Sequence, residues 1–193
     1  MGTDIYGWIE CKTEASAPSW QAVKNLADVY HGRDYTAFGC LFGVRNILDF
    51  EPIAADRGLP ADISPEVAAE AGYFTNGNLC CHTWITWAQV QQINWEETSK
   101  RVEWAIYVYQ YTPDGTLKYL GKEYIGVAPT NTLTLSQYDP TIEQAWAFEN
   151  TTYRTKKVPR KVILPEWQAT FDFLAEQGRL YGDNNVRLVV WFD

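Results

Sequence analysis

The segment that most constrains the fold is the apolar run Val186–Phe192, which reads VRLVVWF. Apart from Arg187, every residue in it is apolar. Such continuous hydrophobicity is typical of a strand in the middle of a sheet whose two faces are both covered. A guanidinium inside such a strand must reach a carboxylate or a pocket, because buried charges are generally paired. We therefore expect a sheet built around this strand and a carboxylate partner for Arg187.

Two antiparallel hairpins are predicted elsewhere in the chain. Residues 4–12 alternate apolar and polar side chains, and residues 20–25 can return beside them. Residues 101–111 show the strongest alternation, and a Pro-Asp-Gly turn leads from them to a partner strand over 117–127. Strands and helices do not alternate regularly along the chain. The sequence therefore predicts an α+β fold, with about three helices packed on a mostly antiparallel sheet, in a single domain that spans all 193 residues.

Apolar stripes and capping residues predict the helices. The segment 33–46 places Tyr35, Phe38 and Phe42 on one helical face, with Asp34 as the N-cap. Pro165 opens a longer amphipathic helix. Shorter helices are expected at 65–71 after Ser64, from Thr86 to about residue 95, and at 141–148, and the basic run 153–161 is expected to be exposed.

The charge balance argues against general nucleic-acid binding. The chain has 24 acidic residues against 16 lysines and arginines, a net charge of −8. Neutralising phosphates needs a basic face, which this composition supplies only locally. No apolar run is long enough to span a membrane and no signal-peptide pattern is present, so we expect no membrane partner and a cytoplasmic location. The four cysteines form no CxxC pair and are expected to be reduced.

Common catalytic and cofactor motifs are missing from the sequence. Walker A, GxGxxG and GxSxG patterns do not occur, which disfavours NTPase, dinucleotide-binding and serine-hydrolase functions. The two histidines, His31 and His82, without CxxC or HExxH, fall short of the usual zinc ligand sets. We predict no metal, no cofactor and no catalytic residue. A packed histidine is the favoured interpretation of His82, and a catalytic base paired with Asp4 is the alternative.

A set of cationic and polar residues in the first half of the chain could converge on an anion. Arginine suits two-pronged recognition of a carboxylate or phosphate. The alternative is that the arginines pair with nearby aspartates and pin a loop to a helix. The residues of this predicted site are Arg33, Arg45, Arg57, His82 and Thr83.

Aromatic residues in the same segments could add a stacking surface. A nucleic-acid base stacks on an aromatic ring for about 1–3 kcal/mol. The alternative is that the rings only fill the core, as aromatic side chains often do. The rings assigned to the predicted ligand site are Tyr6, Trp8, Tyr35 and Trp84.

Five motifs carry a resemblance: MGTDIYGWIE, GRDYTAFGCLFGVRN, RGLPADIS, CHTWIT and VRLVVWFD. Together they resemble a widespread family of small phage and prophage proteins without an assigned function, whose pattern is MGxDIH, GRxYxxF followed by GVR, GLPxDxS, HSxSWL and VRxVFWFD. The resemblance implies a shared fold and a phage origin, but no particular chemistry. This chain departs from the pattern at Tyr6, where the family has His, and at Thr83, where it has Ser.

The leading hypothesis is a phage-encoded, non-enzymatic binding protein that sequesters a nucleotide-derived signal as a counter-defence factor in the cytosol of the host cell. Its expected partner is a small anionic, nucleotide-like ligand, and a pocket between subunits of a homo-oligomer is compatible with that function. One alternative is a nucleotide hydrolase or transferase that uses His82. Another is an acidic inhibitor that binds a host defence protein.

Overall fold

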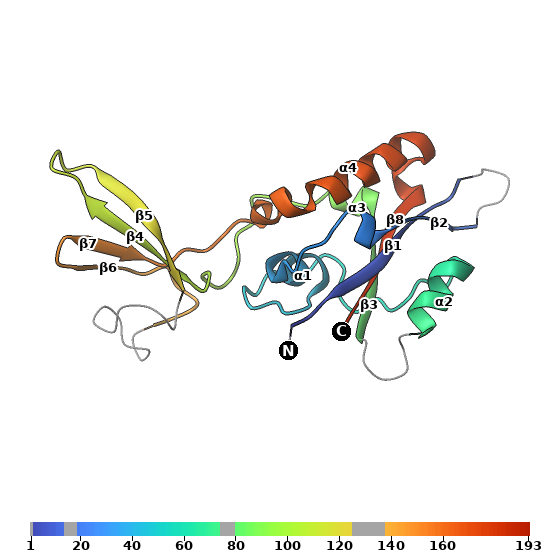
Figure 1. Ribbon diagram of the computed structural model, residues 1–193, viewed down its shortest axis with the longest axis horizontal. Coiled ribbons are helices and arrows are strands. Elements are labelled where there is room, and N and C mark those ends of the chain that lie inside the picture. Colours follow the sequence, from blue (N-terminus) through green and yellow to red (C-terminus); the bar gives the residue numbers. More distant parts are fainter. Residues whose placement is uncertain (1, 14–18, 74–79, 125–137) are drawn as a thin grey trace. The chain divides into compact units, whose positions relative to one another are not determined.

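The structure, a computed structural model, describes residues 2–13, 19–73, 80–124 and 138–193. The chain divides into two compact units. Unit 1 contains Met1–Asn46, Glu51–Trp95 and Lys161–Asp193, and unit 2 contains Ile47–Phe50 and Glu96–Arg160. Each unit has its own antiparallel sheet, which confirms the predicted α+β class (Figure 1). The expectation that the whole chain is one domain stays a prediction.

The sheet of unit 1 is built around the C-terminal strand, as expected. All seven residues of β8 (Val186–Phe192) are buried. The strand pairs antiparallel with β1 (Ile5–Cys11) on one side and with β3 (Cys80–Thr86) on the other. β2 (Gln21–Asn25) adds an outer strand beside β1 and completes the predicted hairpin. The prediction of a central strand covered on both faces is therefore confirmed.

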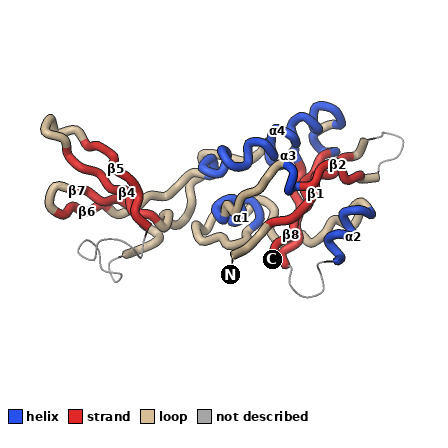
Figure 2. The backbone as a smooth tube through the Cα atoms, in the orientation of Figure 1, coloured by secondary structure: helices blue, strands red, loops and turns tan. Residues whose placement is uncertain are grey.

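Two helices of unit 1 begin at the predicted capping residues. Asp34 caps the first helix by accepting hydrogen bonds from the backbone N–H groups of Thr36 and Ala37. Thr86 caps the third through a complete capping box with Gln89. The helices are α1 (Tyr35–Phe42), α2 (Pro65–Tyr73), α3 (Trp87–Gln91) and α4 (Leu164–Tyr181), joined by the short 3-10 helices η1 (Leu26–Asp28), η2 (Arg160–Ile163) and η3 (Asp183–Asn185) (Figure 2).

Helices cover both faces of the unit 1 sheet, with α4 and α2 on opposite sides of the strands (Figure 1). On one face, Phe38 and Phe42 of α1 make ring contacts with Phe192 of β8. The large α4 residue Trp167 is fully buried against Phe42. On the opposite face, a cluster of side chains from α2 and β8 forms a second core: Val67, Ala71, Val189 and Trp191.

A buried polar network ties the start of β8 to the neighbouring loop. Arg187 Nε donates to Glu10 Oε2 at 2.7 Å, and its NH1 group donates to Asp62 Oδ1 at 2.7 Å. Glu10 also accepts the backbone N–H of Ser64 at 2.8 Å, just before α2. The guanidinium carbon lies 3.8 Å from the centre of the Trp20 ring. The expected carboxylate partner of Arg187 is thus found, and the network fixes β1, β8 and the 62–64 loop together.

Unit 2 is built on a second four-stranded sheet. The predicted hairpin is present as β4 (Ala105–Tyr111) and β5 (Leu117–Tyr124). β7 (Thr151–Arg154) pairs with β4, and β6 (Ala145–Phe148) lies at the edge. The expected helix at 141–148 is wrong, because its last four residues form β6.

The reason for this error is tertiary pairing. Trp146 of β6 stacks on Tyr153 of β7, with ring centres 5.7 Å apart, and both pack with Ile106 and Val108. The run 153–161 is also less exposed than predicted, since Arg160 is fully buried and pairs with Glu97 at 2.9 Å. No helix among the described residues is long and apolar enough to cross a membrane.

Candidate functional site

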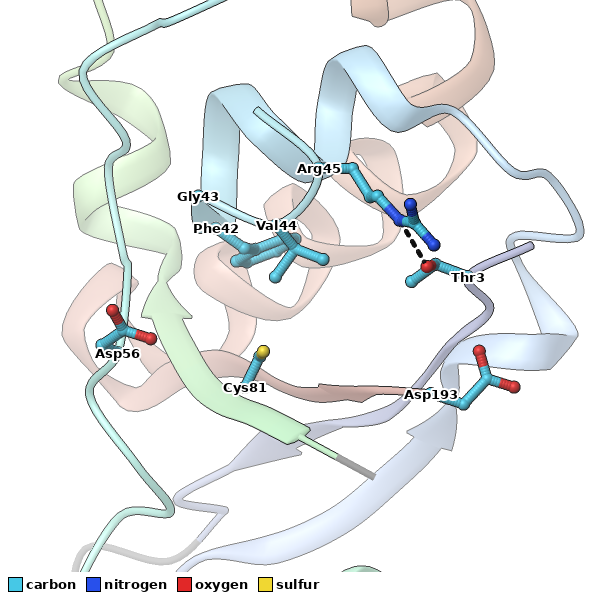
Figure 3. Close-up of a pocket in the computed structure, with 8 residues that line it drawn as sticks. All are labelled: Thr3, Phe42, Gly43, Val44, Arg45, Asp56, Cys81 and Asp193. Carbon is cyan, nitrogen blue, oxygen red and sulfur yellow. Dashed lines mark hydrogen bonds between the residues drawn. The ribbon is translucent and has the colours of Figure 1, made fainter. Parts of the chain in front are cut away.

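A pocket of about 360 Å³ opens in unit 1 at the C-terminal end of α1 (Figure 3). It lies where the segments before β1 and after β8 meet the loop that follows α1 and the start of β3. Its lining side chains carry one guanidinium, two carboxylates and an apolar floor. The lining residues are Thr3, Phe42, Gly43, Val44, Arg45, Asp56, Cys81 and Asp193.

The end of α1 places its last residues at this pocket. Gly43 terminates the helix with a φ of 78°, a left-handed conformation that favours glycine. The backbone N–H of Ala54 donates to the Leu41 carbonyl at 2.8 Å, which brings the loop that carries Asp56 alongside the helix. A side chain at position 43 would begin 3.1 Å from the Ala55 Cβ atom. The tight turn therefore needs glycine both for its conformation and for space.

Left-handed backbone is concentrated at the pocket. Within the described part of the chain, five residues other than glycine have positive φ, and three of them line the pocket: Arg45 at 54°, Asp56 at 51° and Cys81 at 61°. Such conformations cost on the order of 1–3 kcal/mol each and occur preferentially at functional sites. The surrounding structure therefore holds this pocket against local backbone preference.

Cys81 owes its position to an irregularity in β3. The pairing of β3 with β8 shifts register between residues 80 and 83, and a bulge of this kind redirects a side chain. Cys81 is disulfide-bonded, so the expectation that every cysteine is reduced is wrong for this residue. Cys11 and Cys40 are buried thiols outside any disulfide, as expected.

The pocket has mixed charge. Arg45 Nε donates to the Thr3 hydroxyl at 2.8 Å, and its guanidinium carbon lies 6.0 Å from the Tyr35 ring centre. Asp193 accepts the backbone N–H of Asp4 at 2.6 Å, which fixes its carboxylate at the rim. Figure 3 shows Arg45 and Thr3 together, with Asp193 and Asp56 on other sides of the hollow. Such a pocket can offer a cation to an anionic group and carboxylates to hydroxyl or amino donors.

Tyr6 stands close to the carboxylates of Asp193 and Asp4. Burial and the negative charges of Asp193 and Asp4 raise the pKa of its phenol, so it stays protonated at neutral pH. Arg33 forms a two-pronged ion pair with Asp4, in which Arg33 Nε donates to Asp4 Oδ1 and NH2 donates to Oδ2 at 2.7 Å. The hydrogen bonds that it donates to this carboxylate raise the pKa of the Arg33 guanidinium. For Arg33, the structure therefore agrees with the alternative interpretation, in which the arginine pairs with a nearby aspartate.

Arg57 lies away from the pocket lining and is held by neutral oxygens. Its guanidinium donates to the Trp84 carbonyl at 3.0 Å, to the Gln89 side-chain oxygen at 2.8 Å and to the Ile53 carbonyl at 2.8 Å. The guanidinium carbon is 5.2 Å from the centre of the Trp84 ring. Burial lowers its pKa. These contacts tie the loop after α1 to β3 and the start of α3.

The two remaining rings of the predicted site pack on the α2 face of the sheet. Trp8 and Trp84, like Tyr6, contact the core cluster under α2. The Trp8 indole N–H donates to Glu70 Oε2 at 2.6 Å. Tyr35, by contrast, lies on the α1 side, where its hydroxyl accepts the backbone N–H of Thr3 at 3.1 Å. The structure therefore divides the predicted stacking rings between two faces.

His82 and Thr83 point in opposite directions because they are neighbours on one strand. The Thr83 hydroxyl is buried and donates to the Ala54 carbonyl, which attaches the loop after α1 to β3. The His82 ring lies 6.4 Å from the Trp191 ring, its Nε2 atom is buried without a hydrogen-bond partner, and burial lowers its pKa. Within the described part of the chain, the contacts of His82 thus bring it neither a carboxylate nor a nucleophile.

Arg45 is the one predicted site residue that lines the pocket directly; Arg33, Tyr35 and Tyr6 lie next to lining residues. Sequence reasoning missed Thr3, Asp56 and Asp193. Thr3 and Asp193 come together through the pairing of β1 with β8, and Asp56 arrives on the loop that Ala54 attaches to α1. The signal available in the sequence was Gly43 at the end of an apolar helix stripe. Among the residues that the structure describes, no group of three or more His, Cys, Asp or Glu could hold a metal ion.

Comparison of the chain with protein-family models, with curated proteins and with solved structures finds no match.

Proposed function

We propose that this protein is a non-enzymatic binding protein that holds a small nucleotide-like ligand in the pocket at the end of α1, and that a phage uses it to sequester such a signal from host defence. The observation that carries the proposal is the concentration of left-handed residues, Arg45, Asp56 and Cys81, around one hollow. Backbone sterics disfavour these conformations, so they persist only where surrounding contacts impose them. A pocket retained at that cost favours a function in binding.

The chemistry of the lining suits a ligand with both an anionic group and hydroxyl or amino donors. Arg45 offers the charge and planar donors that recognise phosphate. Asp56 and Asp193 offer acceptors for ribose hydroxyls or for the amino group of a base. The volume of about 360 Å³ lies within the usual range of small-molecule sites, about 300–1,000 Å³. A ligand of mononucleotide size fits this description better than a simple anion does.

Binding without turnover agrees with the surroundings of the reactive groups. A nucleophile in an enzyme lies within hydrogen-bond reach of a base that activates it. Cys81 is disulfide-bonded, and the described contacts of His82 are with the Trp191 ring. The enzymatic alternative pairs His82 with Asp4, but the Asp4 carboxylate is held by Arg33. The described contacts therefore do not arrange His82 as a catalytic base. The phage origin implied by the resemblance supports the counter-defence role.

The test is to release and identify a bound ligand. Protein purified from cells with an active defence system would be heat-denatured and the supernatant analysed by mass spectrometry. In parallel, ADP-ribose and cyclic dinucleotides would be added to the purified protein, and its unfolding temperature measured. We expect a nucleotide in the supernatant, an upward shift with the matching probe, and recovery of that probe unchanged after long incubation.

Two variants localise the binding. Arg45→Gln removes the pocket guanidinium and should abolish the thermal shift. Arg179→Gln removes the same charge from the exposed last turn of α4 and should keep it. An empty supernatant with no shift for any probe contradicts the proposal and favours inhibition of a host protein. Conversion of the probe to a product would favour the enzymatic alternative.

A further inference from the structure

One face of the unit 2 sheet combines aromatic rings with cations. The strands β4 and β5 contribute tyrosines, and β5, β7 and the segment after β7 contribute basic side chains. We call this surface the tyrosine–cation face; its members are Tyr107, Tyr109, Tyr119, Lys122, Arg154 and Lys156.

Strand register places these residues on the same side. Tyr107 is paired with Lys122 on β5 and with Arg154 on β7, while Tyr109 is paired with Tyr119. Side chains two apart along a strand share a face, so both pairs project together. The contacts agree: Lys156 Nζ lies 4.5 Å from the Tyr107 ring centre and 5.2 Å from that of Tyr109. Lys122 Nζ lies 4.8 Å from the Tyr107 ring centre, and the guanidinium carbon of Arg154 lies 5.3 Å from that of Tyr109.

The face has more positive than negative charge. Glu103 neutralises Lys122, with an oxygen–nitrogen distance of 2.9 Å. The hydrogen bond of Lys156 goes instead to the Tyr109 hydroxyl, at 2.6 Å. The Arg154 Nε group is buried and makes no hydrogen bond. Neither Arg154 nor Lys156 has a carboxylate partner among the described residues. Two cations on this face are therefore left for an external anion.

The Tyr119 ring on this face is accessible, whereas Tyr107 and Tyr109 are half-buried. Tyr119 is 49% exposed, and Tyr111, the next residue on the same side of β4, is 51% exposed. The opposite side of the sheet carries the apolar cluster of Ile106, Val108 and Tyr153. The core of the sheet thus lies on one side, and exposed rings beside cations lie on the other.

We propose that the tyrosine–cation face binds single-stranded nucleic acid. Proteins that bind single strands without sequence preference combine cations along the phosphate backbone with aromatic rings on which bases stack. A duplex hides its base faces, so the exposed ring of Tyr119 gives an advantage only to unpaired bases. An acidic peptide would use the cations but would gain little from the rings. This site lies in unit 2 and is independent of the pocket function.

The salt dependence of binding follows from the number of cations. Two phosphate contacts, to Arg154 and Lys156, predict a slope of log K against log salt of about −1.4, since each contact contributes about 0.7 for single strands. Affinity should then fall about sevenfold between 50 and 200 mM salt. Because the chain as a whole carries a charge of −8, binding should be confined to this face and modest in strength.

The experiment measures fluorescence anisotropy of labelled 15-nucleotide oligo(dT) and oligo(U) with the full chain at 50 and 200 mM salt. The double variant Arg154→Gln/Lys156→Gln should weaken binding at least tenfold and flatten the salt slope. Tyr119→Ala should weaken it several-fold with the slope unchanged, because it removes stacking and no charge. Lys118→Gln, which removes a charge from the opposite side of the same sheet, should bind like the wild type.

Thermal unfolding of each variant shows whether the fold is retained. Tyr119 is half-exposed, so its loss should leave the fold intact. Absence of binding at 50 mM salt overturns the proposal. The proposal is also overturned if poly-glutamate competes as effectively as oligo(dT). It is overturned as well if both Arg154→Gln/Lys156→Gln and Tyr119→Ala bind like the wild type. Arg45→Gln should keep oligonucleotide binding, so failure of the pocket function and failure of this site are distinguishable.

Discussion

Replacement of Glu10 by glutamine tests the buried network at the start of β8. Glu10 is 0% exposed and Arg187 is 2% exposed. The carboxylate accepts from Arg187 Nε at 2.7 Å and from Ser64 N–H at 2.8 Å. Glutamine has the same shape but one acceptor oxygen. If that oxygen keeps the Ser64 bond, the amide N–H₂ group faces the guanidinium, donor against donor.

The expected loss of stability is large. Breaking one side of a buried ion pair costs about 3–5 kcal/mol. Arg187 keeps its 2.7 Å hydrogen bond to Asp62. The loss of unfolding free energy in Glu10→Gln should therefore lie at the lower end of this range, about 3 kcal/mol. Arg187→Met leaves the Glu10 charge without a cation and should cost more. The double variant should cost less than the sum of the two single changes, because contacting residues are energetically coupled.

Urea unfolding followed by tryptophan fluorescence measures these differences. Lys24→Gln is the control, since it breaks the partly exposed Lys24–Asp28 pair at 3.4 Å and should cost less than about 0.5 kcal/mol. If Glu10→Gln unfolds within about 1 kcal/mol of the wild type, with the same dependence on urea, the network does not stabilise the fold as argued.

Three further changes test other parts of the structure. Hydrogen bonds from Arg187 and Trp20 outweigh burial and hold the pKa of Asp62 below 3.8. The ionised Asp62 therefore stabilises the fold above that pH, and this contribution is lost as the pH falls through the folded-state pKa. In urea titrations, the difference in unfolding free energy between the wild type and Asp62→Asn should close in acid. Gly7→Ala would place a Cβ 2.2 Å from the Val189 carbonyl oxygen and should cost about 1–3 kcal/mol in thermal unfolding, whereas Gly121→Ala meets nothing within 4 Å and should be close to neutral. Glu149 has a φ of 51° in the two-residue turn between β6 and β7. Because a side chain disfavours this left-handed conformation, Glu149→Gly should raise the unfolding free energy by up to about 1 kcal/mol. A clear loss of stability would show that this turn is not strained.

Local signals explain what the sequence predicted well. Asp34 and Thr86 cap helices through contacts within three residues, and such signals can be read directly from the chain. The continuous apolar character of β8 indicated its central position. The residues of β6 were misassigned because strand formation there depends on pairing with β7 and on the Trp146–Tyr153 contact. A four-residue edge strand contains too little pattern to reveal this.

The pocket was predictable only in part, because its residues meet through tertiary structure. Thr3 and Asp193 are at opposite ends of the printed sequence and come together through the pairing of β1 with β8. Asp56 and Cys81 adopt positive φ although neither residue type requires it, so their conformation leaves no clear trace in the sequence. Arg45 was found because arginine suggests anion recognition irrespective of its surroundings.

The buried network and the pocket are connected through strand register. Arg187 stands opposite Glu10 near one end of the β1–β8 ladder, and Phe192 stands opposite Ile5 at the other end, next to Asp193 and Thr3. A slip of β8 by one residue would turn every side chain to the opposite face. It would take Arg187 away from Glu10, leaving both charges buried and unpaired, and would carry Asp193 away from Thr3 and Arg45. An apolar pair in place of Glu10 and Arg187 would penalise such a slip far less, so the charged pair favours the register in which the pocket exists.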